Sequence, residues 1–225
     1  MVESDAGKLG KRNGEDSEID AGHAEPKGEK SNRCAARHRN PDGGHKTDPG
    51  TNAEMHIERR RRIGAEADER ATIAAFLRWQ RETLELKCAG LDAAGLARRS
   101  VDPSTLSLLG LVRHMAEVER GWFRRVMAGQ DAPPHFYSDA DPDGDFDRAV
   151  PDPELIAEAW EVWRAEVAFA ERLVAEAPDL DVTGNDPWRG AVSLRWVLVH
   201  MVEEYARHNG HADLLRQRID GRVGQ

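Results

Sequence analysis

The chain has 225 residues, with 32 Lys and Arg against 41 Asp and Glu, and its formal net charge is −9 at pH 7. Nucleic-acid-binding domains carry clustered basic residues on a net positive surface, so this charge argues against a nucleic-acid partner. No stretch approaches the roughly 18 consecutive apolar residues that would indicate a membrane-spanning helix. Residues 1–20 also lack the apolar core of a signal peptide. We therefore expect a cytoplasmic protein with no membrane partner.

Residues 1–65 differ in composition from the rest of the chain. They contain no Phe, Trp or Tyr, and they hold 13 Lys and Arg with 12 Asp and Glu. Such a stretch buries too little apolar surface to offset the entropy lost on ordering. We predict that residues 1–65 are a disordered N-terminal extension and that residues 66–221 form the folded domain. Met55 is an alternative start, in which case residues 1–54 would not belong to the native protein.

Helical periodicity dominates the folded part. It predicts four long helices, over about 68–87, 105–127, 153–177 and 192–219. A short helical turn is expected at about 92–98, and Ser104 or Thr105 is expected to cap the second long helix. The segments 129–152 and 177–191, rich in Asp, Pro and Gly, are predicted to be loops, and no strand signal is present. The pattern predicts an all-α protein, built as a four-helix bundle.

The fourth predicted helix contains HMVEEYARHNGH, residues 200–211. At about 100° per residue, four side chains that can bind metal fall within an arc of about 80°: His200, Glu204, His208 and His211. Glu204 and His208 are one turn apart and can converge on one point, as paired ligands do in HExxH helices. A surface ion pair between them is the structural alternative. Helical geometry alone does not choose among the four residues.

A metal site also needs a ligand from another element, and His114 on the second predicted helix is the candidate. It lies at helical spacing among Leu111, Val118 and Trp122. A histidine within an apolar stripe is more often a core residue than a ligand. The pair on the fourth helix makes a ligand role for His114 the better hypothesis.

Three segments resemble the DinB-like superfamily: ADERATIAAFLRWQRETLELKCAGL, TLSLLGLVRHMAEVERGWF and SLRWVLVHMVEEYARHNGHADLLR. The resemblance covers most of residues 66–221 and is closest to a branch of unknown function related to mycothiol-dependent maleylpyruvate isomerase. It implies an up-down-down-up four-helix bundle.

The resemblance also implies a metal triad of His114, Glu204 and His208. The first matches the family's ligand on the second helix, and the other two match the pair on the last helix. His211 stands where many relatives have Gln, and His200 is not a usual ligand, so the roles of these two residues stay open.

Three protein ligands leave a coordination position open, as in catalytic zinc sites. Zn²⁺ is the expected ion, although Ni²⁺ and Fe²⁺ also suit histidine and carboxylate ligands. Relatives with known activity use low-molecular-weight thiols such as mycothiol. We therefore expect a metal-dependent thiol S-transferase or isomerase, whose partners are a small electrophile and mycothiol or a similar thiol. One alternative is a non-catalytic metal-binding protein that acts in the stress response or in protein interactions. Another is a metal-dependent hydrolase.

Four further residues are candidates for contacts with substrate or with the ligands. His211 and Arg207 could bind substrate or orient a ligand, whereas Trp122 and Trp196 could wall a pocket or simply pack in the core. Cys88 is expected to be buried rather than reactive. A homodimer is plausible because apolar stripes on long helices often pair.

Overall fold

The structure, a computed structural model, describes residues 68–224. The predicted disordered extension therefore lies outside the described residues. The elements are α2 (Glu69–Cys88), α3 (Ala93–Ala97), α4 (Leu108–Glu119), η2 (Arg120–Met127), α5 (Gly144–Asp147), α6 (Pro153–Glu176), β1 (Thr183–Asp186), β2 (Gly190–Ser193) and α7 (Leu194–Asp220). This part of the chain is mostly helical, as predicted, although β1 and β2 depart from the predicted all-α class. None of the helices in this part of the chain is long and apolar enough to cross a membrane.

Side-chain caps account for several of the predicted helix boundaries. Asp68 caps α2 by accepting a hydrogen bond from the backbone N–H of Ala71. Asp152 caps α6, which begins with Pro153, a residue that needs no N–H partner at that position. Gly221 ends α7 in the left-handed conformation, with φ of 78°. These capping residues stand in the sequence where the hydrophobic periodicity begins or ends. The two signals therefore indicate the same helix boundaries.

The second long helix differs from its prediction at both ends. Ser107, rather than Ser104 or Thr105, is the N-cap, because its Oγ accepts from the N–H of Gly110 at 3.1 Å. The last two turns, Arg120–Met127, form the π-helix η2. A wider turn of this kind shifts the phase of every following side chain. A periodicity of 100° per residue cannot reveal such a shift.

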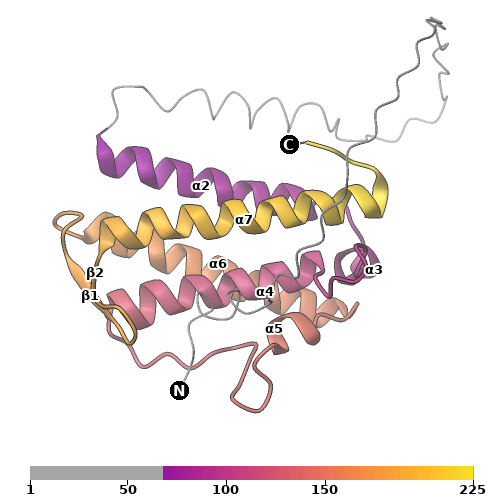
Figure 1. Ribbon diagram of the computed structural model, residues 1–225, viewed down its shortest axis with the longest axis horizontal. Helices are drawn as coiled ribbons and strands as arrows, with labels where there is room; N and C mark the ends of the chain where they lie inside the picture. Colours follow the sequence, from indigo (N-terminus) through magenta and orange to yellow (C-terminus); the bar gives the residue numbers. More distant parts are fainter. Residues whose placement is uncertain (1–67, 225) are drawn as a thin grey trace, which may run out of the picture. The chain divides into compact units, whose positions relative to one another are not determined.

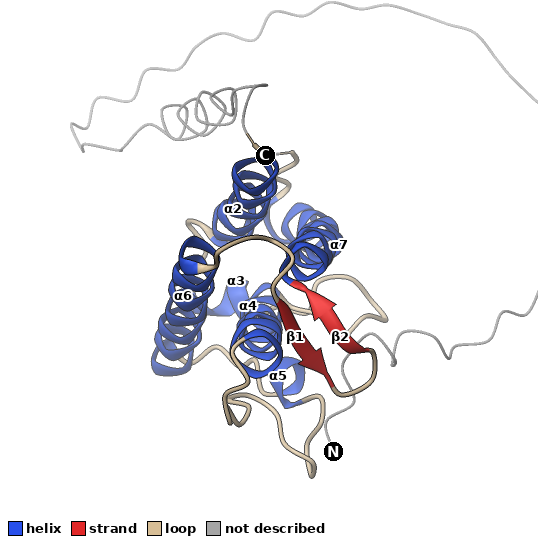
Figure 2. Ribbon diagram, turned by 90° about the vertical axis from the view of Figure 1, so that its left-hand side faces the viewer, coloured by secondary structure: helices blue, strands red, loops and turns tan. Residues whose placement is uncertain are grey.

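Residues 183–193 form an antiparallel hairpin, whereas the sequence predicted a loop up to residue 191 and a helix from about residue 192. Thr183 pairs with Ser193 and Asp186 pairs with Gly190. The hairpin lies against η2 and the start of α7 (Figure 2). Gly184 permits this packing, because a Cβ there would collide with the carbonyl of Val126. The prediction missed the strands because each has only four residues and little β-branched content.

The other loop, 129–152, contains the short helix α5, which was also missed. The backbone carbonyls of Gly144 and Asp145 accept hydrogen bonds from Arg113 of α4 at 3.0 and 2.9 Å. Arg113 is buried, and its two hydrogen bonds hold α5 against α4.

The long helices pack in pairs, with α2 along α7 and α4 along α6 (Figure 1). Arg195 at the start of α7 binds Glu69 at the start of α2 at 2.7 Å. Arg216 near the end of α7 donates to the carbonyl of Lys87 near the end of α2 at 2.8 Å. The two helices therefore run in the same direction.

A buried polar network joins all four long helical segments. Arg81 of α2 donates to both carboxylate oxygens of Glu119 of α4, at 2.7 and 2.8 Å. The hydroxyl of Tyr205 on α7 donates to the same carboxylate at 2.8 Å, and Trp163 of α6 donates to that hydroxyl at 2.9 Å. Glu119 and Tyr205 are fully buried. The buried apolar core includes Leu77, Leu84, Met115, Phe123, Leu198 and Met201.

Replacing Glu119 tests the importance of this network. Glu119→Gln leaves the buried Arg81 cation without its counter-charge, and we expect a loss of about 3–5 kcal/mol in the free energy of unfolding. Urea denaturation followed by circular dichroism measures it. Glu171→Gln is the matched control, because Glu171 also approaches Arg81, at 3.8 Å, but its side chain is half exposed. The control should cost under about 1 kcal/mol. Equal losses in the two variants would contradict the assignment.

Candidate metal centre

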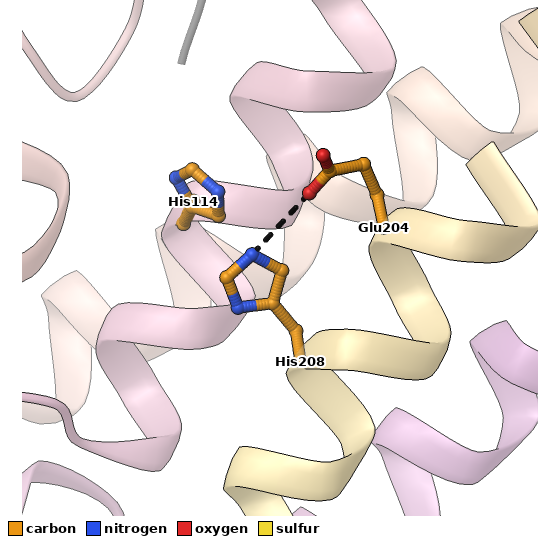
Figure 3. A group of neighbouring side chains, drawn as sticks. All are labelled: His114, Glu204 and His208. Atoms are coloured by element: carbon orange, nitrogen blue, oxygen red, sulfur yellow. Dashed lines mark ion pairs between the residues drawn. The ribbon is translucent and has the colours of Figure 1, made fainter. Parts of the chain in front are cut away.

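His114, Glu204 and His208 lie together between α4 and α7 (Figure 3). Each offers one possible ligand atom, and these three atoms are all within 4.8 Å of one another. Nε2 of His208 is 3.5 Å from one oxygen of Glu204. All three side chains are buried. Two imidazoles and a carboxylate that converge at a buried point are a donor set that divalent zinc accepts.

Asp145 of α5 orients His114, and the sequence analysis missed it. Its Oδ2 is 2.9 Å from Nδ1 of His114. This contact leaves Nε2 as the nitrogen that would face an ion, an arrangement common in histidine metal ligands. Phe146 stacks on the same imidazole, with ring centroids 4.8 Å apart. The sequence shows Asp145 only as one of four aspartates in the acidic segment DPDGDFD. Nothing local distinguishes it from its neighbours as the partner of His114.

The other two histidines on the predicted face of α7 lie at the edge of this cluster. Nδ1 of His211 is 3.5 Å from Nδ1 of His208, on the side of that ring away from Glu204. Nε2 of His200 is 3.8 Å from Oε1 of Glu204. The geometry therefore separates the four residues that periodicity had grouped. Glu204 and His208 turn toward His114, and the other two flank them.

The electrostatics of the pair on α7 suit metal binding. The hydrogen bond to His208 lowers the pKa of Glu204 more than burial raises it. Burial, helped by the charges of His114 and His211, lowers the pKa of His208 despite the opposing influence of Glu204. At neutral pH the site therefore holds a carboxylate and a neutral imidazole, the protonation states that metal ligands require.

Arg207, Trp122 and Trp196 are the three remaining candidates from the sequence. Arg207 bonds Glu203 at 3.0 Å and also approaches Oε1 of Glu204 at 3.6 Å. The indole rings of Trp122 and Trp196 are 5.3 Å apart. Trp122 is buried, whereas Trp196 is 39% exposed. Trp196 therefore has surface available for a contact beyond its own packing.

Cys88 is buried at the end of α2, as predicted. Burial raises the pKa of its thiol to about 12, although the charge of Arg216 acts in the opposite direction. The thiol therefore remains protonated at neutral pH, and Cys88 is unsuited to act as a nucleophile.

Asp145→Leu should weaken metal binding, because His114 would lose the group that orients its ring. We expect affinity to fall about 10- to 100-fold, as for other partners of metal-bound histidines. Asp145→Asn, which keeps an acceptor oxygen, should have a smaller effect. Competition with a chromophoric chelator measures the affinity. Asp147→Asn is the control, because Asp147 lies on the same short helix but is exposed and pairs with Arg99. Unchanged affinity in Asp145→Leu would refute this role.

Thiol reactivity tests the state of Cys88. In a Cys34→Ser variant, Cys88 should resist alkylation by iodoacetamide at pH 8 in the native protein and react rapidly in urea. Both its burial and its raised pKa slow the native reaction. Mass spectrometry counts the modified chains. Comparable rates in the native and unfolded states would contradict the assignment.

The comparison with known protein families agrees with the sequence resemblance. Residues 72–221 match the family described as mycothiol-S-transferase. No curated protein matches the chain. A similar solved structure is described as the crystal structure of the conserved protein of locus from Enterococcus faecalis. It is 16% identical, covers 69% of this chain and 99% of its own, and has a TM-score of 0.49. On the strength of the family match, the chain belongs to the mycothiol-S-transferase family of DinB-like proteins.

Proposed function

We propose that this protein is a metal-dependent S-transferase that joins mycothiol or a similar low-molecular-weight thiol to a small electrophile. One observation carries the proposal. His114, Glu204 and His208 converge within 4.8 Å between α4 and α7, in a chain of the mycothiol-S-transferase family. The transfer forms a bond between sulfur and carbon, and the thiol proton and the leaving group of the electrophile are released.

His114, Glu204 and His208 would hold the metal ion. The donor set and the contact between His114 and Asp145 both fit a divalent cation. Zn²⁺ is our preferred ion, and Ni²⁺ or Fe²⁺ would also suit these ligands. A divalent cation there supplies positive charge that favours the thiolate over the thiol of a bound cosubstrate.

Neighbouring residues would prepare the site for substrate. Arg207 balances the charges of Glu203 and Glu204 at the edge of the triad. His211 lies behind His208 and orients its ring. Because the thiol of Cys88 is buried, the reacting sulfur is not that of Cys88, and it comes from the cosubstrate in this proposal.

We further infer that α2, α4 with η2, α6 and α7 form an up-down-down-up four-helix bundle within a domain of residues 66–221. The common direction of α2 and α7 supports this topology. A cytoplasmic location and a homodimer remain predictions.

Metal analysis of the purified full-length protein tests the triad. We expect stoichiometric divalent metal in the wild type and loss of most of it in His114→Ala, because one of three ligands is removed. His135→Ala is the control, since this histidine lies near Glu166, outside the cluster. Stoichiometric metal in His114→Ala would refute the triad.

Turnover tests the reaction. Metal-loaded protein should accelerate the reaction of mycothiol with an activated aryl chloride, and Glu204→Gln should lose most of the acceleration. Consumption of substrate in thiol-free buffer would indicate a hydrolase instead. Bound metal without acceleration by any of several thiols would indicate a non-catalytic metal-binding protein.

A further inference from the structure

We propose that Trp122, Trp196, His200 and Arg189 form a binding site for an aromatic electrophile that carries a negative charge. We call these four residues the aromatic shelf. The inference rests on the proposed S-transfer and names the class of its second substrate. Arg189 has no role implied by the match to the mycothiol-S-transferase family or by a motif in the sequence.

Three rings of the shelf form one continuous cluster. The indole of Trp196 stacks on His200 with centroids 4.9 Å apart, and Trp122 meets the same imidazole edge-on at 4.8 Å. Trp122 comes from η2, and the other two residues come from the first turns of α7. Trp196 remains 39% exposed. The cluster therefore presents aromatic surface to a ligand instead of burying it completely.

Arg189 adds a cation beside these rings. Its guanidinium lies 5.4 Å from the ring centre of Trp196 and 5.9 Å from that of Trp122. Asp186 approaches it at 3.5 Å, but the same carboxylate oxygen also accepts the N–H groups of Trp188 and Arg189. Because the Asp186 carboxylate is shared among these contacts, some N–H donors of the Arg189 guanidinium remain for the anionic group of a ligand.

The packing of the hairpin against η2 brings Arg189 close to the tryptophans of the aromatic shelf. The close approach of Gly184 to the Val126 carbonyl sets the hairpin against η2. Its turn then carries Arg189 to Trp122. π-Helical segments occur frequently at functional sites, where they redirect side chains.

The shelf borders the triad. Nε2 of His200 and Nη1 of Arg207 approach the same oxygen of Glu204, Oε1, at 3.8 and 3.6 Å, whereas Oε2 faces His208. A flat ring bound on the shelf would therefore be separated from Glu204 of the candidate metal centre by His200. Its anionic group would pair with Arg189, in a chain whose net charge of −9 otherwise repels anions.

Isothermal titration of the full-length protein with 2-naphthoate and with neutral 2-naphthamide tests the shelf. The two probes share one ring system, so their difference reports on charge. We expect naphthoate to bind about tenfold more tightly, through a charge-assisted bond to Arg189. Arg189→Gln should abolish that preference, and Arg189→Lys should keep part of it. Trp196→Ala should weaken both probes about tenfold through loss of stacking.

Two controls make the binding result specific. Arg172→Gln removes an exposed arginine of α6 and should leave both affinities unchanged. His114→Ala removes a proposed metal ligand, and in this variant the preference for naphthoate should persist. Loss of the preference in His114→Ala would mean that the metal holds the carboxylate. That outcome, or equal binding of the two probes by the wild type, would overturn the shelf.

Kinetics separate this inference from the proposed function. With mycothiol, 4-chloro-3,5-dinitrobenzoate and its amide each form a thioether and release chloride and a proton. Arg189→Gln should raise KM for the carboxylate about tenfold with little change in kcat, and leave the amide unaffected. Metal-dependent turnover without this discrimination would refute the shelf and leave the S-transferase intact. Arg189-dependent binding of naphthoate without any turnover would refute the S-transferase and leave the shelf.

Discussion

Glu119 is a fully buried carboxylate, and the packing of the long helices depends on satisfying it. Arg81 and Tyr205 bond it directly, and Trp163 completes the network by donating to the tyrosine hydroxyl. Each residue comes from a different long segment. Sliding or rotating any one of them would leave a buried polar group without a partner, at a cost of several kcal/mol. The network therefore selects one register among the many in which apolar stripes could pack.

The candidate metal centre follows from that register. Tyr205 is adjacent to Glu204 on α7, so the bond between Tyr205 and Glu119 also sets the direction in which Glu204 points. His114 lies on α4 together with Glu119. The packing that buries the network thus brings the two ligand-bearing helices to a fixed separation. A site held by regular helices in this way is preorganised for an ion.

Irregular elements provide the surroundings of the centre. α5 supplies Asp145, which orients His114, and the turn of the hairpin supplies Arg189 beside the two tryptophans. η2 redirects Trp122 toward α7. Rigid helices thus hold the proposed ligands, while short segments between them carry the groups that orient a ligand or would select a substrate. This division is common among enzymes, because loops vary more freely than the core.

Hydrophobic periodicity and caps in the sequence determined the positions of the long helices, since these signals are local. The spacing placed Glu204 and His208 on one face with His200 and His211, the second helix offered His114, and the family resemblance selected the triad. Asp145 and Arg189 could not be predicted, because their partners are distant in the chain and lie in segments without periodicity. The phase shift in η2 was equally invisible, since a fixed periodicity of 100° per residue does not describe a π-helix. Helical geometry by itself left His200, His208 and His211 equivalent, and the tertiary structure shows which of them turns toward α4, because rotation of a helix is set by its neighbours.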